Sequence, residues 1–265
     1  TYLIDIGMKQ DGFLSTSKGH APVYEHAIAT YALAEAYTFC SQLGVAVPNL
    51  GEVTQLAGQY IIDHQSSNGG WAYGYAGNGG DLSIAAWQIQ ALKACKHTKL
   101  DFEDMRKAYK NAEKFVISTQ RPAGGFGYKP GRGGHGRGGY HTLTGAGMLS
   151  LQMMGKESSK EVRDGADYII KNSKLDYDTK FADLYGHYYE GQAMINRGGK
   201  QWKHYNDMFR DEILNSQNAD GSWKKPGDGT KLRAVGAKYE TNVHYRTCLN
   251  ILMLEVYYRF LPGTT

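Results

Sequence analysis

Side chains that can bind a ligand or move protons gather before, or at the start of, apolar segments of this chain. They are phenols, imidazoles, carboxylates and one guanidinium. The candidate site residues are Tyr24, Glu25, His26, Asp81, Tyr140, His141, Asp183, Tyr185, His187, Glu240, His244, Tyr245 and Arg246. Tyrosine, histidine and carboxylates serve as general acids and bases, and arginine holds carboxylates by paired hydrogen bonds. We expect a polar site wherever the fold brings these segments together, with Tyr24, Glu25, His26, His187 and His244 as catalytic candidates.

Two pairs within this set have the spacing of metal ligands on a helix. Asp183 precedes His187 by four residues, and Glu240 precedes His244 by four residues. Side chains at this spacing lie on one face of a helix, so each pair can offer two ligands to a metal ion. A polar network that satisfies buried helix ends explains the same residues without a metal. We therefore assign no cofactor and keep metal binding as an alternative.

A turn in which an aromatic residue follows glycine recurs along the chain and defines its organisation. The copies are Gly12-Phe13, Gly69-Gly70-Trp71, Gly124-Gly125-Phe126 and Gly221-Ser222-Trp223. Their aromatic residues are 58, 55 and 97 positions apart, and a degenerate copy at 174–178 divides the last interval. Regular spacing of this kind is typical of repeat proteins. The sequence predicts five units of roughly fifty residues each.

Each unit is predicted to be a helical hairpin with an outer and an inner helix. The helices before the turns are one-faced: Tyr2–Lys9, Glu52–His64, Phe102–Thr119, Val162–Ile170 and Tyr205–Leu214. The helices after the turns are apolar on most sides: Val23–Cys40, Leu82–Cys95, His141–Met154, Leu184–Ile195 and Asn242–Phe260. A helix that is apolar nearly all round is a buried one, so we place the second helix of each pair inside. Alternating inner and outer helices build either a superhelix or a closed toroid. In a toroid the polar starts of the inner helices converge at one mouth.

Composition and charge exclude several classes of protein. The chain has 265 residues and a net charge of +4, with 30 basic and 26 acidic side chains intermixed, so we expect no nucleic-acid partner. No uninterrupted apolar stretch approaches the roughly 18 residues of a membrane span. The three cysteines are expected to be small buried apolar residues.

The start of the chain bears on its completeness and location. Because it begins at Thr1, we expect residues 1–265 to be one domain and the C-terminal part of a longer protein. The compartment stays open, and a secreted or periplasmic location is consistent with a leader removed upstream.

The repeated motif resembles that of the prenyltransferase/squalene-cyclase family. The copies Ala57-x2-Tyr60-Ile61-x3-Gln65-x3-Gly69-x-Trp71 and Ala112-x2-Phe115-Val116-x3-Gln120-x3-Gly124-x-Phe126 fit the repeat of squalene–hopene cyclases. Gln217-x3-Gly221-x-Trp223 matches its second half, and Gln10-x-Gly12-Phe13 is a shortened copy. The resemblance implies an all-α fold, an α/α toroid of about five repeats with a central cavity. The glutamines, glycines and aromatic residues then have structural roles: the amide bonds backbone groups at helix ends.

The chemistry of that family is not retained at its usual positions. Squalene cyclases protonate an alkene with the middle carboxyl of an Asp-x-Asp-Asp segment. Here only the first aspartate is kept, as Asp81, and the acid position is occupied by Ser83 and, in the preceding repeat, by Tyr24. A phenol is far too weak an acid to protonate an alkene. We therefore expect a cyclase-like domain without the cyclase acid.

Three functions remain open for such a domain. The first is a polar central pocket that binds a small molecule or a saccharide through tyrosine faces and polar edges. The second is an enzyme, either polysaccharide lyase-like or isoprenoid-processing, that uses Tyr, His and Glu at the cavity mouth. The third is a non-catalytic scaffold for protein interaction. Whether the chain is an enzyme is left undecided.

Overall fold

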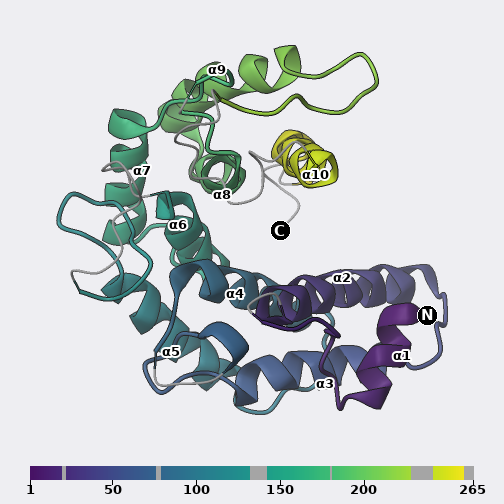
Figure 1. Ribbon diagram of the computed structural model, residues 1–265. Coiled ribbons are helices and arrows are strands. Elements are labelled where there is room, and N and C mark those ends of the chain that lie inside the picture. Colours follow the sequence, from purple (N-terminus) through teal and green to yellow (C-terminus); the bar gives the residue numbers. More distant parts are fainter. Residues whose placement is uncertain (20–21, 76–78, 132–141, 180, 228–240, 260–265) are drawn as a thin grey trace. The chain divides into compact units, whose positions relative to one another are not determined.

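The computed structural model of the chain describes residues 1–19, 22–75, 79–131, 142–179, 181–227 and 241–259 (Figure 1). Within these ranges the chain is mostly helical and has no strands beyond two isolated bridges. The prediction of an all-helical chain is therefore confirmed for the described residues. Its contacts group into two compact units, Thr1–Ser118 and Thr119–Thr265, and each is described by itself.

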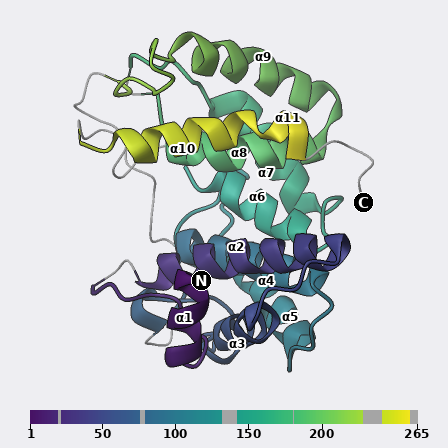
Figure 2. The same cartoon turned by 90° about the vertical axis from the view of Figure 1, so that its right-hand side faces the viewer.

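The first unit consists of two inner helices covered on one side by outer ones. In chain order it contains α1 (Tyr2–Lys9), α2 (Pro22–Leu43), α3 (Leu50–Asp63), the single-turn 3-10 helix η1 (Tyr73–Tyr75), α4 (Leu82–His97) and α5 (Met105–Ser118). Helices α2 and α4 lie side by side, α3 packs against both, and α5 packs against α4 (Figures 1 and 2). This is the predicted alternation of outer and inner helices.

The second unit repeats the same arrangement. It contains α6 (Thr144–Met153), α7 (Lys160–Asn172), α8 (Leu184–Arg197), α9 (Gly199–Asn215), α10 (Val243–Leu254) and α11 (Val256–Arg259). Helix α8 lies between α6 and α10, and the outer helices α7 and α9 pack against α6 and α8. The predicted single helix Asn242–Phe260 is wrong in one respect, because it is interrupted at Glu255. The break accompanies the packing of the Tyr257 ring against α9, where its centroid lies 6.0 Å from that of Trp202.

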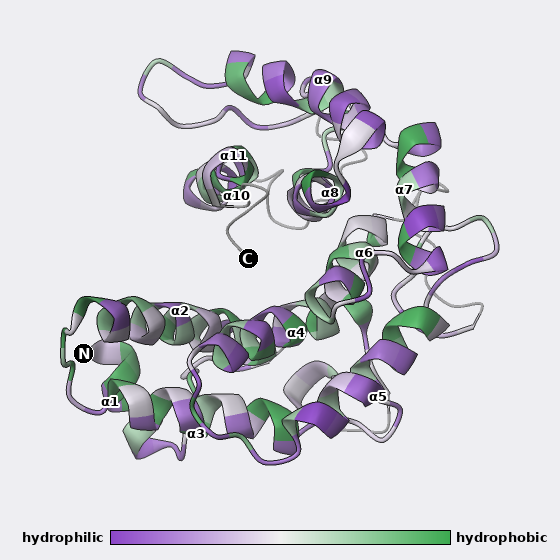
Figure 3. Cartoon of the chain, turned by 180° about the vertical axis from the view of Figure 1, so that it is seen from behind, coloured by the Kyte–Doolittle hydropathy of each residue, from purple (hydrophilic) through white to green (hydrophobic). Residues whose placement is uncertain are grey.

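Burial separates the two kinds of helix as their sequences predict. In α4, α6 and α8 nearly every side chain is buried, whereas α5 buries one stripe made of Ala108, Ala112, Phe115 and Val116. Hydrophilic stretches are visible on the outer helices α5, α7 and α9 in Figure 3. Although the inner helices are apolar, no helix among the described residues has both the length and the hydropathy of a membrane span.

In two of the turns the repeated glutamine joins the turn to the outer helix of the next hairpin. In the first unit the Gln65 side-chain nitrogen donates to the Gly69 carbonyl at 3.0 Å and to the Ala108 carbonyl of α5 at 2.9 Å. In the second unit Gln120 donates to the Gly124 carbonyl at 3.0 Å and to the Glu161 carbonyl of α7 at 2.8 Å. The predicted structural role of these glutamines is therefore confirmed.

Glycine is required in these turns because their backbone lies directly against the next outer helix. Gly69 has φ +87° and Gly124 has φ +95°, a region that favours glycine. A Cβ atom would lie 2.2 Å from the Asn111 carbonyl oxygen at Gly69 and 2.4 Å from the Asp164 carbonyl oxygen at Gly124. No side chain fits between the turn and the helix at either position.

The tryptophans of two turns bond the outer helix that precedes each turn. The Trp71 indole donates to the Ile61 carbonyl at 2.8 Å, and the Trp223 indole donates to the Ile213 carbonyl at 2.7 Å. Both rings are buried. Each ring therefore ties its turn to the outer helix that precedes it, while its large apolar surface fills the core.

The cysteine prediction holds for one residue of three. Cys95 is buried, but Cys40 is half-buried and Cys248 is exposed. Cys248 lies on the side of α10 opposite to its buried side, which carries Leu249 and Met253. The apolar composition of α10 predicted burial all round, whereas only one side of this helix is covered among the described residues.

Replacing Gly124 by alanine measures the contact between turn and outer helix, with Gly221→Ala as the matched control. Gly221 has φ +85° in the same kind of turn, but a Cβ atom there would meet nothing closer than 4.0 Å. We expect both variants to lose about 1 kcal/mol of unfolding free energy from backbone strain. Gly124→Ala should lose at least about 2 kcal/mol more because its Cβ collides with α7. Urea unfolding followed by circular dichroism checks this, and equal losses would contradict it.

Candidate functional site

The predicted site residues fall into two groups, one in each unit. Tyr24, Glu25, His26 and Asp81 belong to the first unit. The second unit holds Asp183, Tyr185, His187, His244, Tyr245 and Arg246, whereas Tyr140, His141 and Glu240 lie outside the described residues. The prediction that all of them line one mouth stays a prediction, and each group is described where it lies.

A chain of hydroxyl groups connects the starts of α2 and α4 in the first unit. The Ser83 hydroxyl donates to the Asp81 carboxylate at 2.6 Å and lies 2.8 Å from the Tyr24 hydroxyl. The Tyr24 hydroxyl lies 3.2 Å from that of Tyr73 in η1. Because each hydroxyl has one proton, Tyr24 must donate to Ser83 and Tyr73 must donate to Tyr24. The four residues form a directed relay from Tyr73 to the buried Asp81.

Asp81 and its counterpart in the second unit also cap inner helices. Asp81 precedes α4 and accepts from the Ser83 backbone N–H at 2.9 Å. Asp183 precedes α8 and accepts from the Gly186 backbone N–H at 3.2 Å. A carboxylate at this position satisfies backbone donors that lack a partner within the helix and interacts favourably with the helix dipole. Both predicted ligand-binding aspartates therefore have a structural task.

Glu25 and His26 are neighbours in sequence, but their side chains contact different groups. The Glu25 carboxylate accepts from the Ser15 hydroxyl at 2.6 Å and from the Ser17 hydroxyl at 2.8 Å. It fixes the segment before α2. Of the three adjacent catalytic candidates Tyr24, Glu25 and His26, Tyr24 is the one that belongs to the hydroxyl relay.

His26 is fully buried in a cluster of aromatic rings. Its Nδ1 accepts from the Leu14 backbone N–H at 3.0 Å, so the neutral ring carries its proton on Nε2. Nε2 has no hydrogen-bond partner of normal geometry, although the Ala57 carbonyl is close enough to favour a proton there. Burial is the dominant effect and lowers the pKa of His26 to about 3. His26 is therefore neutral at pH 7.

The rings around His26 come from three hairpin segments. The His26 ring centroid lies 5.2 Å from Phe13, 5.0 Å from Tyr60 and 5.8 Å from Tyr75. His64 stacks on Tyr60 at 3.8 Å. Burial also raises the pKa of the Tyr75 phenol well above its usual value. Because burial keeps both His26 and Tyr75 uncharged at pH 7, neither side chain is suited to proton transfer there.

His187 and Glu190 form a buried pair in the second unit. The His187 Nδ1 lies 2.8 Å from the Tyr205 hydroxyl and 3.3 Å from a Glu190 carboxylate oxygen. Its Nε2 lies 3.1 Å from the Lys174 carbonyl, and the same Glu190 oxygen accepts from the Ser173 hydroxyl at 2.6 Å. The network joins α8 to α9 and to the segment that follows α7.

The pKa of His187 is shifted in the opposite direction to that of His26. Burial lowers its pKa, but the hydrogen bond and charge of Glu190, with smaller effects of Asp183 and the Lys174 carbonyl, outweigh burial and raise the pKa above its usual value. Both ring nitrogens already have protein partners, so a metal ion would have to displace one. Among the described residues no group of three or more His, Cys, Asp or Glu side chains is arranged to hold a metal.

The remaining predicted residues of the second unit do not share one cluster. Arg246 is buried, and its Nε donates to the Trp223 carbonyl at 3.3 Å, whereas the adjacent Tyr245 and His244 are exposed. Desolvation and then the Asp183 carboxylate raise the pKa of Tyr245 to about 12, so these two residues face one region. The Tyr185 ring packs edge-on against Tyr189 at 5.2 Å.

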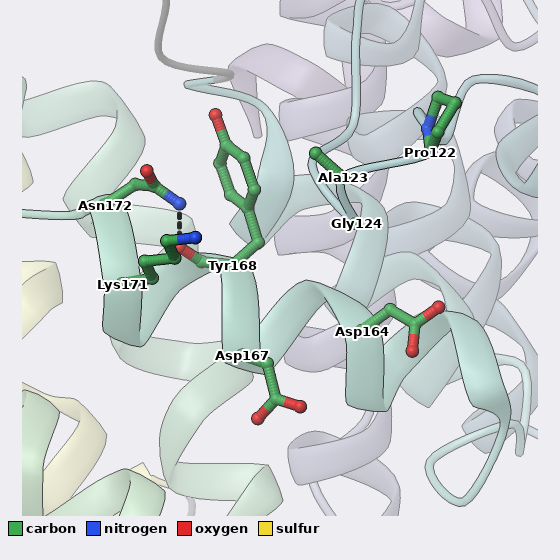
Figure 4. Close-up of a pocket in the computed structure, with 8 residues that line it drawn as sticks. All are labelled: Pro122, Ala123, Gly124, Asp164, Asp167, Tyr168, Lys171 and Asn172. Atoms are coloured by element: carbon green, nitrogen blue, oxygen red, sulfur yellow. Dashed lines mark hydrogen bonds between the residues drawn. The ribbon is translucent and has the colours of Figure 1, made fainter.

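A pocket in the second unit lies away from all of these residues. It has a volume of about 390 Å³ and lies where the turn 122–124 meets α7 (Figure 4). Its other walls are Asp164, Asp167, Tyr168, Lys171 and Asn172, and the Asn172 side chain donates to the Tyr168 carbonyl at 2.8 Å. None of the predicted site residues lines this pocket.

Several members of these networks are absent from the set predicted by sequence. Tyr73 and Tyr205 have no sequence signal, because one lies in a turn and the other on an outer helix that the fold brings to its partner. Glu190 follows His187 by three residues, a spacing that places the two side chains on one helix face. That spacing is the one signal that could have identified a missed residue.

Comparison with protein-family models and with curated protein sequences finds no match to this chain.

Acidification should destabilise the protein through His26. Its pKa of about 3 lies below the 6.5 of an unfolded histidine, so between these values only the unfolded state binds the proton. Stability is therefore complete above pH 6.5 and falls as the pH drops toward 3, by on the order of several kcal/mol. His26→Asn keeps an acceptor for Leu14 but does not titrate, so its unfolding free energy should fall less between pH 6.5 and 4. Equal acid sensitivity of both proteins would contradict this.

Alkaline pH should lower the stability of the protein through His187, because the pKa of this residue is shifted in the opposite direction to that of His26. Its pKa is raised, so its contribution is complete below pH 6.5 and is lost as the pH rises through the folded-state pKa. Glu190→Gln removes the charge that raises this pKa and nearly keeps the shape. Unfolding free energies measured between pH 6 and 9 should decline for the wild type and stay flat or rise for the variant. The same decline in both would show that Glu190 does not set the pKa.

Proposed function

We propose that this chain is a ligand-binding domain of the prenyltransferase/squalene-cyclase repeat type, with its hairpins arranged as an α/α toroid. Its ligand is a hydroxyl-rich molecule, a saccharide, which binds at the starts of inner helices. The domain lacks the carboxylic acid with which squalene cyclases protonate their substrate.

The repeated contact between turn and outer helix supports the toroid. Gly12 approaches the backbone of Leu56 in α3, Gly69 approaches Asn111 in α5, and Gly124 approaches Asp164 in α7. The same kind of contact recurs between each of these turns and the next outer helix, so it holds successive outer helices in the same geometry. A constant relation of this kind generates a regular curve, and a toroid is the closed form of such a curve.

The hydroxyl relay from Tyr73 to Asp81 is the observation that carries the ligand proposal. Tyr73 is 42% exposed, and its ring meets that of Tyr24 at 6.0 Å with an interplanar angle of 66°. An exposed tyrosine face packs against the apolar face of a sugar ring, while hydroxyls that both donate and accept match sugar hydroxyls. Asp81 anchors the relay and fixes its direction. The combination suits a neutral polyol better than an ion.

The same residues argue against alkene protonation. The cyclase acid position holds Ser83, whose hydroxyl proton is committed to Asp81, and Tyr24 occupies the equivalent position of the preceding repeat. Neither a hydroxyl nor a phenol is acidic enough for that reaction. The surviving hydrogen-bonding groups support recognition of a ligand.

Calorimetric titration with oligosaccharides tests this function. The probes are the neutral oligosaccharides cellohexaose, xylohexaose and mannohexaose, each added to the wild-type chain. We expect at least one to bind with a Kd of about 1 mM or tighter. Tyr73→Ala should weaken that binding roughly tenfold because it removes the exposed ring, and Tyr24→Phe should weaken it because it breaks the relay.

Tyr2→Ala is the control, because Tyr2 is an exposed tyrosine on α1 that takes no part in the relay. Its affinity should equal that of the wild type. Absence of heat with all three probes, or equal losses in Tyr2→Ala and Tyr73→Ala, would reject the proposed site.

A further inference from the structure

Helix α2 has an apolar composition on all sides, yet one of its sides is exposed. Ile28 is 44% exposed, Phe39 61% and Leu43 76%, while Val23, Ala27 and Ala34 on the opposite side are buried. Five of the exposed side chains of α2 recur every three or four residues and form one stripe, which consists of Ile28, Ala32, Ala36, Phe39 and Leu43. Within the first unit, no described segment covers this α2 stripe.

The α2 stripe has little polar character to keep it solvated. The 22 residues of α2 include no lysine or arginine, and its two charged residues are Glu25 and Glu35. Helical spacing places Glu25 in line with the stripe, one turn before Ile28, and Glu35 at its edge. The Glu25 carboxylate already accepts hydrogen bonds from Ser15 and Ser17. Val45 and Val47, in the loop after α2, are also exposed and extend the apolar surface. Continuous apolar surfaces of this size mark interaction sites.

We propose that the α2 stripe is a homodimer interface, in which α2 packs antiparallel on α2 of a second copy. A two-fold axis beside Glu35 and Ala36 sets Ile28 of one chain opposite Leu43 of its partner. The same axis sets Ala32 opposite Phe39. A large side chain thus faces a small one near the centre, and two aliphatic side chains meet at each end. The stripe is complementary to itself, as an isologous contact requires.

The area of the stripe agrees with a dimer of moderate affinity. Large apolar side chains offer on the order of 200 Å² each, so the exposed parts of Ile28, Phe39, Leu43, Val45 and Val47 present roughly 500 Å². Two copies would bury roughly 1,000 Å², which is about the lower limit for a specific interface. The contact lies on the first unit alone and does not depend on the proposed saccharide site.

Analytical ultracentrifugation of the intact chain tests the dimer. Between about 1 and 100 µM the weight-average mass should rise from that of a monomer toward that of a dimer. Phe39→Glu buries a charge in the contact and should raise the dissociation constant at least tenfold. The matched control is Leu214→Glu, because Leu214 is a comparably exposed apolar residue, 48% exposed, on α9. Its dissociation constant should stay within twofold of the wild type.

A disulfide between copies tests the antiparallel register. Cys40→Ala and Cys248→Ser remove the two cysteines that are not fully buried, and Ile28→Cys and Leu43→Cys are then added together or singly. Within one chain these two positions are about 22 Å apart along α2, too far for a disulfide. The double variant should therefore oxidise to a covalent dimer, and each single variant should remain monomeric on a non-reducing gel.

Other outcomes would overturn the inference. A chain that stays monomeric at all concentrations would mean that the stripe is covered within the molecule or not used. A dimer that Phe39→Glu leaves intact would place the contact elsewhere. Covalent dimers from Ile28→Cys alone would show that the two helices run parallel.

Discussion

The side-chain amide that joins two backbone carbonyls is the interaction on which the rest of this structure depends. Gln65 and Gln120 each hold the carbonyl of their own turn and a carbonyl of the following outer helix. One side chain therefore fixes both the shape of a turn and the place of the next hairpin. The glycine four residues later leaves room for the contact. In the Gln65 turn the Trp71 indole also bonds the preceding helix, whereas the Gln120 turn has Phe126 at the equivalent position. Where the shortened first copy departs from this pattern, Gln10 bonds within its own turn, to the Phe13 and Ser15 carbonyls.

Helix ends account for much of the polarity at the starts of the inner helices. Asp81 and Asp183 cap α4 and α8, and Glu25 orders the segment before α2. A buried helix start leaves backbone donors that must find acceptors, so polar residues gather there in any fold of this kind. Function must therefore be sought in what exceeds this requirement. The relay of Tyr73, Tyr24 and Ser83 does so, because Asp81 alone would suffice as a cap.

The two buried histidines show how identical side chains acquire opposite roles. His26 lies among aromatic rings, where nothing compensates the loss of water, and it stays neutral. His187 is equally buried, but Glu190 supplies a charge at 3.3 Å, so the protonated ring is favoured. The first residue limits stability in acid and the second in alkali. Both lie in segments that sequence patterns assign to a single site, although their environments have nothing in common.

The sequence alone determined the helical hairpins and their order. Gly-aromatic turns, one-faced outer helices and apolar inner helices are local patterns, so Gln65 and Gln120 could be given their structural roles without coordinates. Which polar side chains meet was decided by the tertiary structure. Tyr73 reaches Tyr24 across 49 residues and Tyr205 reaches His187 across 18, and the two members of each pair lie on different elements, so the period of a single helix predicts neither contact. Exposure was also decided there, since Cys248 and the α2 stripe have the composition of a core. Periodicity reports the surface that a helix can bury, but the neighbours that cover it belong to other parts of the fold.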